Sequence, residues 1–320
     1  MRGRSHSSGE RRGSEIVVKW DKVAGLQVRS PIMLAAGILG ETYDSLKRVE
    51  EEGAGALVTK SIGPEPNPGY PGPITVEVRG GFLNAVGLAN PGFEAFGREL
   101  EGRMKDEPFE VPVLASIYGA CAGDFRNTLE GLEDFVDGFE LNLSCPHSEK
   151  FGLAVGSDPE LVGEIVRECR QLTGKPLVVK LSPNVNSIES IAVAAEDGGA
   201  DAICAINTVG PGMAIEIESR RPVLSNGRGG LSGPCIKPIA VRCIYDIYEA
   251  VDVPVIGVGG IADALDAVEL MEAGATWVQL GTALYLGRFS LFREIREGLE
   301  EFLETHGMTH GELVGSAHPG

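Results

Sequence analysis

Short apolar runs alternate with amphipathic stretches along most of the chain. Each apolar run is bounded by glycine, proline or polar residues, which is typical of a buried strand. The stretches between the runs repeat apolar residues every three or four positions, which is typical of a helix with one buried face. The pattern predicts strands over residues 31–37, 56–61, 111–119, 139–146, 176–183, 200–208, 254–260 and 276–283. It predicts helices over residues 45–52, 92–104, 124–134, 158–172, 188–197, 236–251, 262–273 and 291–306.

The ends of these segments carry helix signals. Asp158 is placed to cap the fourth helix and Pro159 to fill its first position. Glycines such as Gly174 and Gly274 separate helices from the strands that follow. Eight strand–helix repeats predict an α/β fold of the (β/α)8 or TIM-barrel type, and a doubly wound sheet is the alternative that fits the count less well.

Two insertions interrupt the repeat. Residues 63–90 are rich in glycine and proline, and residues 208–233 contain two alternating pieces, 214–218 and 222–225, that predict a hairpin. Both insertions follow strand C-termini, where barrel enzymes build their active sites. A short β-hairpin over residues 15–28 is expected to close the opposite end of the barrel.

The sequence shows no linker, so residues 15–320 are expected to form one catalytic domain. Residues 1–14 are polar and basic without an apolar core, which predicts a disordered tail and not a signal peptide.

Composition narrows the range of partners. The chain has 320 residues, of which 46 are acidic and 28 basic, so its net charge is −18. The basic residues do not cluster into a basic patch along the sequence. This balance argues against nucleic acid or an anionic membrane surface as a partner. No apolar stretch approaches the roughly 18 residues of a membrane span. Six cysteines without a C-x-x-C pair argue against a zinc ribbon or an iron–sulfur cluster within the chain, and favour reduced thiols in a cytoplasmic protein.

Polar residues follow several of the predicted strands and should converge on one mouth of the barrel. Lys180 stands inside an apolar strand, which requires a partner: an anionic cofactor ring, or a structural ion pair as the alternative. Asn142 and Asn207 can each donate and accept hydrogen bonds, which suits a planar heterocycle. The glycine-rich turns at 257–260 and 281–282 predict a phosphate site after the last two strands, and glycines that only turn the chain are the less favoured alternative. The other residues at these strand ends are Lys60, Ser61, Cys145 and Thr208.

Cys145 lies in Ser144-Cys145-Pro146-His147, where a strand ends abruptly in polar residues. A thiolate can act as a base, a nucleophile or a metal ligand, and a buried, inert thiol is the alternative. Cys145 and His147 could share one side of an extended chain, but no further metal ligands are evident among the five histidines. A metal site is therefore not expected.

Several motifs together resemble the dihydroorotate dehydrogenases. The resemblance covers nearly the whole chain after residue 15, in order and at matching spacing. It is closest to the soluble NAD-linked class, whose FMN subunit pairs with a subunit that carries FAD and an iron–sulfur cluster. The motifs are residues 84–92 (Asn-Ala-Val-Gly-Leu-Ala-Asn-Pro-Gly), 141–146 (Leu-Asn-Leu-Ser-Cys-Pro), 180–184 (Lys-Leu-Ser-Pro-Asn), 207–208 (Asn-Thr), 230–234 (Gly-Leu-Ser-Gly-Pro) and 257–260 (Gly-Val-Gly-Gly).

The resemblance implies one FMN per chain and the oxidation of dihydroorotate to orotate in pyrimidine (UMP) biosynthesis. Cys145 would take the C5 proton while a hydride leaves C6 for the flavin, and Lys180 would stabilise negative charge on the reduced flavin. The residues that it assigns to FMN are Ala36, Gly37, Lys60, Ser61, Asn142, Lys180, Ile206, Ser232, Gly233, Gly259, Gly260, Gly281 and Thr282. Those that it assigns to the substrate are Lys60, Asn84, Val86, Gly87, Leu88, Asn142, Asn207 and Thr208.

One residue departs from the family pattern. Many dihydroorotate dehydrogenases have asparagine where this chain has His147, and dihydropyrimidine dehydrogenases, which act on uracil and thymine, resemble it in having histidine. Those enzymes tend to carry an acidic residue at the position of Val86, which would repel the orotate carboxylate. Dihydroorotate is therefore the expected substrate, with a dihydropyrimidine as the alternative. A tRNA dihydrouridine synthase is disfavoured by the acidic charge, and a non-enzymatic phosphate-binding barrel by the convergent lysines and asparagines.

The resemblance also implies an assembly. A homodimer of FMN subunits is expected, or a heterotetramer that includes the FAD and iron–sulfur subunit. The physiological oxidant, NAD through that partner or another acceptor such as fumarate, stays open at the level of the sequence.

Overall fold

The computed structural model describes residues 19–143 and 152–319. Eight parallel strands form one sheet in the order β1-β14-β13-β8-β7-β6-β5-β2. The first and last strands of this order also meet: Met33 bridges Ala56, and the Leu34 N–H donates to the Ala56 carbonyl at 3.0 Å. The sheet therefore closes into the predicted (β/α)8 barrel. Its strands are β1 (Ile32–Leu34), β2 (Leu57–Val58), β5 (Val113–Ile117), β6 (Gly138–Asn142), β7 (Leu177–Leu181), β8 (Ala202–Ala205), β13 (Val255–Val258) and β14 (Ala275–Leu280).

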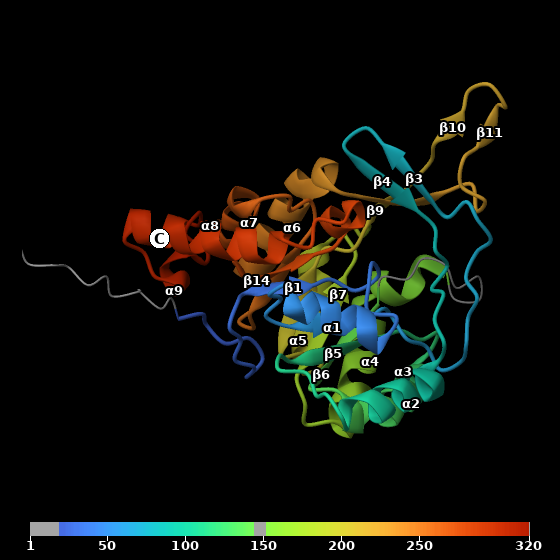
Figure 1. Cartoon of the computed structure of the whole chain (residues 1–320), viewed down its shortest axis with the longest axis horizontal. Coiled ribbons are helices and arrows are strands. Elements are labelled where there is room, and N and C mark those ends of the chain that lie inside the picture. Colours follow the sequence, from blue (N-terminus) through green and yellow to red (C-terminus); the bar gives the residue numbers. More distant parts are fainter. Residues whose placement is uncertain (1–18, 144–151, 320) are drawn as a thin grey trace, which may run out of the picture.

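Helices follow the strands and surround the barrel (Figure 1). The capping prediction is confirmed at α4, where the Asp158 side chain accepts from the N–H groups of Glu160 and Leu161 and Pro159 occupies the first turn. The helices are α1 (Tyr43–Glu51), α2 (Phe93–Met104), α3 (Ala122–Leu132), α4 (Pro159–Leu172), α5 (Ile188–Asp197), α6 (Lys237–Ala250), α7 (Ala264–Glu272), α8 (Leu291–His306) and α9 (His310–Leu313). Short 3-10 helices are η1 (Glu133–Phe135), η2 (Gly152–Ser157), η3 (Pro234–Ile236) and η4 (Thr282–Leu286). Within the described ranges, no helix has the length and apolar character to cross a membrane.

The side chains on the two faces of each barrel strand pack into two different hydrophobic clusters. One face packs against the helices, and the other fills the barrel interior with side chains such as Leu114, Val178, Ile256 and Trp277. This division follows from the two-residue period of a strand. The barrel is consequently a packed core, and a ligand can enter only at its ends.

The N-terminal segment closes one end of the barrel. Val23 and Leu26 form an antiparallel bridge, and Val23 packs on the interior cluster beside Trp277, whose indole N–H donates to the Asp21 carbonyl at 2.9 Å. The sequence predicted a hairpin over residues 15–28. Its described part is a tight turn with one bridge, and residues 15–18 lie outside the described residues.

The insertions build a second sheet above the other end. Strands β3 (Thr75–Val78), β4 (Gly81–Asn84), β12 (Gly229–Ser232) and β9 (Val209–Gly212) pair antiparallel in the order β3-β4-β12-β9. The sequence predicted only a hairpin here, which is confirmed as β10 (Ile215–Glu216) and β11 (Arg221–Pro222) and projects from the molecule (Figure 1). The four-stranded sheet was not predicted because its strands are four residues each and three of them, β4, β9 and β12, contain glycine.

Candidate active site

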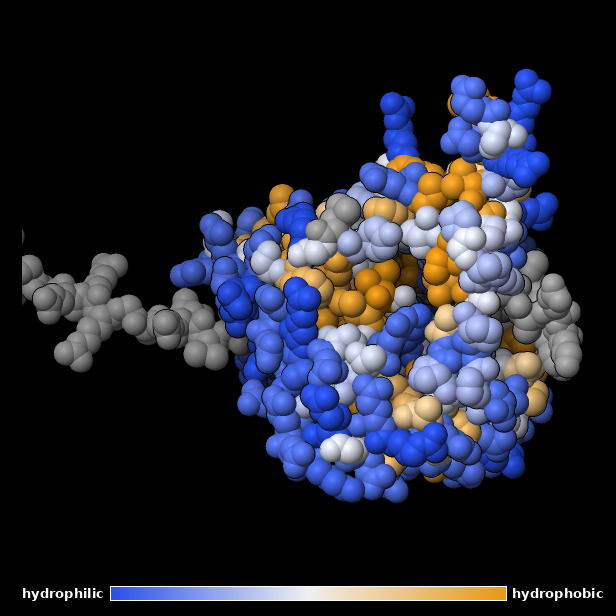
Figure 2. All heavy atoms as spheres, turned by 45° about the vertical axis from the view of Figure 1, so that its right-hand side comes forward, coloured by the Kyte–Doolittle hydropathy of each residue, from blue (hydrophilic) through white to orange (hydrophobic). Residues whose placement is uncertain are grey.

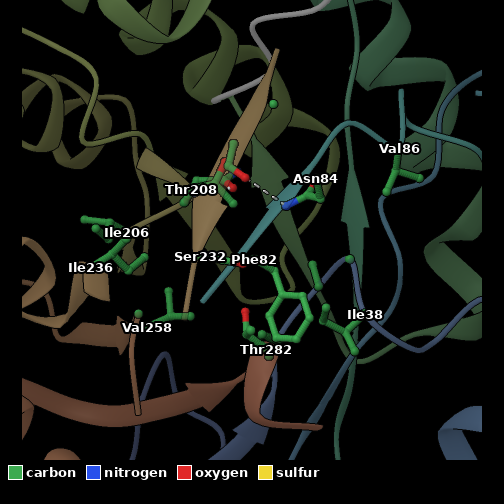
Figure 3. Close-up of a pocket in the computed structure, with 18 of the residues that line it drawn as sticks. Ile38, Phe82, Asn84, Val86, Ile206, Thr208, Ser232, Ile236, Val258 and Thr282 are labelled. Carbon is green, nitrogen blue, oxygen red and sulfur yellow. Dashed lines mark hydrogen bonds between the residues drawn. The ribbon is translucent and has the colours of Figure 1, made fainter. Parts of the chain in front are cut away.

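A cavity of about 860 Å³ lies between the C-terminal ends of the barrel strands and the second sheet. Apolar side chains gather around the hollow on this face of the molecule (Figure 2), and Figure 3 shows Asn84 of β4 directed toward Thr208 and the Phe82 ring of β4 directed toward Thr282. All predicted FMN and substrate residues line this one cavity. The predicted base, Cys145, and its neighbour His147 lie outside the described residues. The lining residues that the sequence predicted are Ala36, Gly37, Lys60, Ser61, Asn84, Val86, Gly87, Leu88, Asn142, Lys180, Ile206, Asn207, Thr208, Ser232, Gly233, Gly259, Gly260, Gly281 and Thr282.

A chain of hydrogen bonds connects polar side chains at the cavity floor. The Ser61 and Ser116 hydroxyls lie 2.9 Å apart, and the Asn142 amide donates to Ser61 Oγ at 3.0 Å. The Asn207 amide in turn donates to Asn142 Oδ1 at 3.4 Å. These bonds orient the two asparagine side chains, so that donors and acceptors are arranged before a ligand binds.

Lys180 is buried, with 5% of its surface exposed, and is held on two sides. Its ammonium group donates to Gln279 Oε1 at 2.9 Å and lies 3.4 Å from Glu140 Oε1. Burial acts to lower the pKa of Lys180, but the attraction of the Glu140 carboxylate, with a smaller contribution from Cys204, leaves the pKa above its usual 10.5. Of the two expected partners of Lys180, the structure shows the ion pair, and Lys180 also lines the cavity.

Lys60 is the other lysine among the described residues that lines the cavity. Its ammonium group pairs with the carboxylate of Glu41, a more exposed residue that also lines the cavity. An anionic ligand that contacts Lys60 must therefore compete with a carboxylate already present in the chain.

Glu140, Gln279 and Glu41 are site features that the sequence reasoning missed. Glu140 carried a usable signal, because it stands two residues before Asn142 in a predicted strand and must share the inward face with it. A glutamate inside an apolar strand is as unusual as the lysine at position 180. The partnership of Gln279 with Lys180 joins strands far apart in the sequence and has no local signature.

The glycine turns fall into two kinds. Gly259 and Gly260 have φ values of +132° and +82°, and a Cβ on Gly260 would lie 2.6 Å from Lys237 Cβ. Packing against α6 therefore requires these glycines with or without a ligand. Gly281 has a negative φ of −125°, and among the described residues a Cβ there would meet nothing closer than Ala35 Cβ at 3.5 Å. Packing of the protein leaves space beside that glycine, which is what a site of close ligand approach predicts.

The cavity fits a flavin nucleotide in its chemistry. It offers a buried cation, oriented amide groups for a heterocycle, apolar walls and an open glycine in the turn after the last strand. Among the described residues, no group of three or more histidine, cysteine or acidic side chains is arranged to hold a metal ion.

The closed barrel and its large cavity at the strand C-termini define a barrel enzyme. Residues 20–303 match the family model described as dihydroorotate dehydrogenase. The chain therefore belongs to the dihydroorotate dehydrogenase family, and the resemblance seen in the sequence is confirmed.

Curated relatives narrow the class. The chain is 48% identical over 298 residues to the dihydroorotate dehydrogenase B (NAD(+)) catalytic subunit of Methanothermobacter thermautotrophicus, covering 92% of this chain and 97% of that protein. The same name belongs to relatives in Pyrococcus horikoshii, 48% identical over 297 residues, and Methanosarcina mazei, 50% identical over 299 residues. Alignment covers 92% of this chain in both cases, with 96% and 94% of the two relatives.

Proposed function

We propose that this chain is the catalytic subunit of an NAD-linked dihydroorotate dehydrogenase and oxidises dihydroorotate to orotate for pyrimidine synthesis. The observation that carries the proposal is the convergence of all described FMN and substrate residues on one cavity. Identity of 48–50% to catalytic subunits over 92% of the chain supports the substrate and the class.

FMN, when bound, supplies the acceptor for a hydride from the substrate. The glycines at 259, 260 and 281 and the Thr282 hydroxyl would hold its phosphate, and the buried Lys180 ammonium group would face its ring. The charge of Lys180 favours the negative charge that reduction places on the ring. Ala36, Gly37, Lys60, Ser61, Asn142, Ile206, Ser232 and Gly233 would complete the FMN pocket.

The substrate would bind through the remaining polar groups of the cavity. Asn142 and Asn207 would hydrogen-bond the edges of the pyrimidine, with Asn84 and Thr208 on the side of the second sheet. The Lys60 ammonium group would attract the carboxylate of dihydroorotate once its contact with Glu41 is exchanged. Val86, Gly87 and Leu88 would contact the substrate from the adjacent loop.

Cys145 would act as the general base. Its thiolate would take the proton from C5 as the C5–C6 double bond forms and the hydride leaves C6, which balances the two-electron oxidation. Neighbouring cations lower the pKa of a thiol from about 8.5, and in this proposal the lysines of the cavity would have that effect on Cys145.

Electrons must then leave the cavity for an external acceptor. The sequence has no C-x-x-C pair and no separate dinucleotide fingerprint, so transfer to NAD requires a partner subunit. We assign that role to a subunit carrying FAD and an iron–sulfur cluster, in a heterotetramer built on a homodimer of this chain.

Anaerobic reduction tests the substrate. The purified protein is expected to be yellow, and dihydroorotate is expected to bleach the flavin absorbance. Dihydrouracil, which lacks the carboxylate, is the matched control and should leave the spectrum unchanged. Bleaching by dihydrouracil alone would replace orotate with a dihydropyrimidine substrate.

A second experiment tests the base. Cys145→Ala should retain FMN and lose at least 10²-fold in the rate of flavin reduction by dihydroorotate, since a general base contributes about 10²–10⁴. Cys121→Ala removes an exposed thiol beside α3 and is the matched control. Equal rates in the two variants remove Cys145 from the mechanism.

A further inference from the structure

Three buried polar side chains meet inside the barrel beneath the cavity. Glu140 on β6 is 0% exposed, and Gln279 on β14 is 1% exposed. The Gln279 amide donates to Glu140 Oε2 at 2.8 Å, while Gln279 Oε1 accepts from the Lys180 ammonium group at 2.9 Å. Lys180 and Gln279 line the cavity, and Glu140 stands behind them without lining it.

The surroundings of Glu140 offer no other charge. Its register neighbours are Ser116 on β5 and Val178 on β7, and Cys204 on β8 interacts with it across the interior. Burial raises the pKa of the Cys204 thiol, which therefore stays neutral. Lys180 is thus the one cation facing Glu140 within the described part of the barrel.

A buried ion pair of this kind contributes little to folding. The desolvation of each ion costs several kcal/mol and roughly cancels the attraction, and an apolar pair of similar volume is often as stable. The arrangement does place one ammonium group, held at two points, at the floor of the cavity. We therefore interpret the ion pair as a means of orienting the Lys180 ammonium group, and not mainly as a source of barrel stability.

We propose that Glu140, braced by Gln279, is a positioning residue that holds the Lys180 ammonium group charged and directed toward an anion bound in the cavity. The inference rests on the proposed function, under which that anion is reduced FMN. Glu140 touches neither FMN nor substrate in this scheme and acts through Lys180 alone.

The charge of Lys180 depends on this carboxylate. Glu140 outweighs the effect of burial and raises the pKa of Lys180, so the ammonium group persists through neutral and alkaline pH. Glu140→Gln removes the largest effect that opposes burial, which lowers the pKa of Lys180. The variant should therefore lose the lysine charge as pH rises.

The test is the midpoint potential of bound FMN between pH 6 and pH 9 in the native protein and in Glu140→Gln. The quantity compared is the affinity for reduced FMN divided by the affinity for oxidised FMN. Relative to the native protein, this ratio in the variant should be at least tenfold lower at pH 9 than at pH 6. Tenfold corresponds to a fall of about 30 mV for two electrons. A purely structural role would lower thermal stability without this pH-dependent step.

Two further variants sharpen the result. The exchange of Glu140→Gln with Gln279→Glu returns a carboxylate to Lys180 and should restore the native pH profile. In a Lys180→Met background, Glu140→Gln should have no further effect on the potential. If Glu140→Gln fails to fold, Gln279→Leu carries the test: it keeps the carboxylate, removes the brace and should lower the potential at every pH.

The outcomes separate this inference from the proposed function. A native protein without affinity for FMN overturns both. If the native protein binds FMN and the midpoint potential of the Glu140→Gln variant equals that of the native protein at every pH, only the role of Glu140 is overturned. The same holds for an unchanged potential in Gln279→Leu when that variant is the one that folds.

Discussion

Gly281 is a glycine that packing among the described residues does not require, because an added Cβ would meet nothing closer than Ala35 Cβ at 3.5 Å. Gly281→Ala should leave the free energy of unfolding of the FMN-free protein within about 0.5 kcal/mol of the native value. FMN affinity should fall about tenfold, or about 1.4 kcal/mol, because the added methyl group occupies space that the ligand approaches. Thermal unfolding of FMN-free protein and titration with FMN measure the two effects.

Gly260→Ala is the contrasting variant. Its φ of +82° and the 2.6 Å approach of a Cβ to Lys237 Cβ are unfavourable before any ligand is considered. It should destabilise the FMN-free protein by about 1–3 kcal/mol. A Gly281→Ala protein that is equally destabilised, with unchanged FMN affinity, would show that Gly281 serves the fold.

At the scale of residues, the sequence predicted the residues that line the cavity better than the residues that hold those side chains in place. Lys180 was recognised because a lysine in an apolar strand needs a partner, and the structure places Glu140 and Gln279 beside it. Glu140 was overlooked although it shares that anomaly and its spacing from Asn142 indicated the same face. The pairing of Glu41 with Lys60 depends on loop geometry that periodicity does not encode.

At the scale of elements, strand β12 packs closely on the residues after β8. A Cβ on Gly230 would lie 2.1 Å from Thr208 Oγ1, and the Gly230 carbonyl accepts from the Asn84 amide at 3.4 Å (Figure 3). Gly230→Ala must displace Thr208, a predicted substrate residue. The variant should raise KM for dihydroorotate by about tenfold, the effect of about 1.4 kcal/mol of lost binding, with FMN content near the native level.

Gly174→Ala is the control for that prediction. Gly174 lies outside the cavity lining, has no positive φ, and nothing stands within 4 Å of the added Cβ. Steady-state kinetics of both variants at equal FMN content give the comparison. An unchanged KM in Gly230→Ala would mean that β12 does not shape the substrate side of the cavity.

The elements that the sequence predicted well are those with a strong period. Helix α8 spans Leu291–His306 as predicted, because its apolar stripe is continuous. Strands β3, β4, β9 and β12 went unrecognised because they are only four residues each, and because glycines in β4, β9 and β12 remove the alternation that marks a strand. Their pairing across two distant insertions comes from tertiary contacts.

At the scale of the whole molecule, residues near the two ends of the described chain meet at the closed end of the barrel. His310 of α9 is 1% exposed, packs edge-on against Trp20, and accepts from the Asp21 N–H through Nδ1 at 3.2 Å. That hydrogen bond requires Nδ1 to be unprotonated. Burial lowers the pKa of His310 below 6.5, outweighing the opposite effect of the Asp21 carboxylate.

The direction of this shift fixes a pH dependence. A group whose pKa is lowered by folding contributes stability that is complete above its unfolded pKa, about 6.5, and is lost as pH falls through the folded value. The unfolded chain binds a proton that the folded chain resists, so Tm should fall between pH 7.5 and pH 5. His310→Gln keeps an acceptor for the Asp21 N–H without a titrating ring, and its fall in Tm should be smaller by about 2 °C or more. His306→Gln removes an exposed ring on α8 and should follow the native profile. If Tm falls equally in the native and His310→Gln proteins, the group responsible for the acid sensitivity lies elsewhere. The contact between His310 and Asp21 would then not depend on pH in this range.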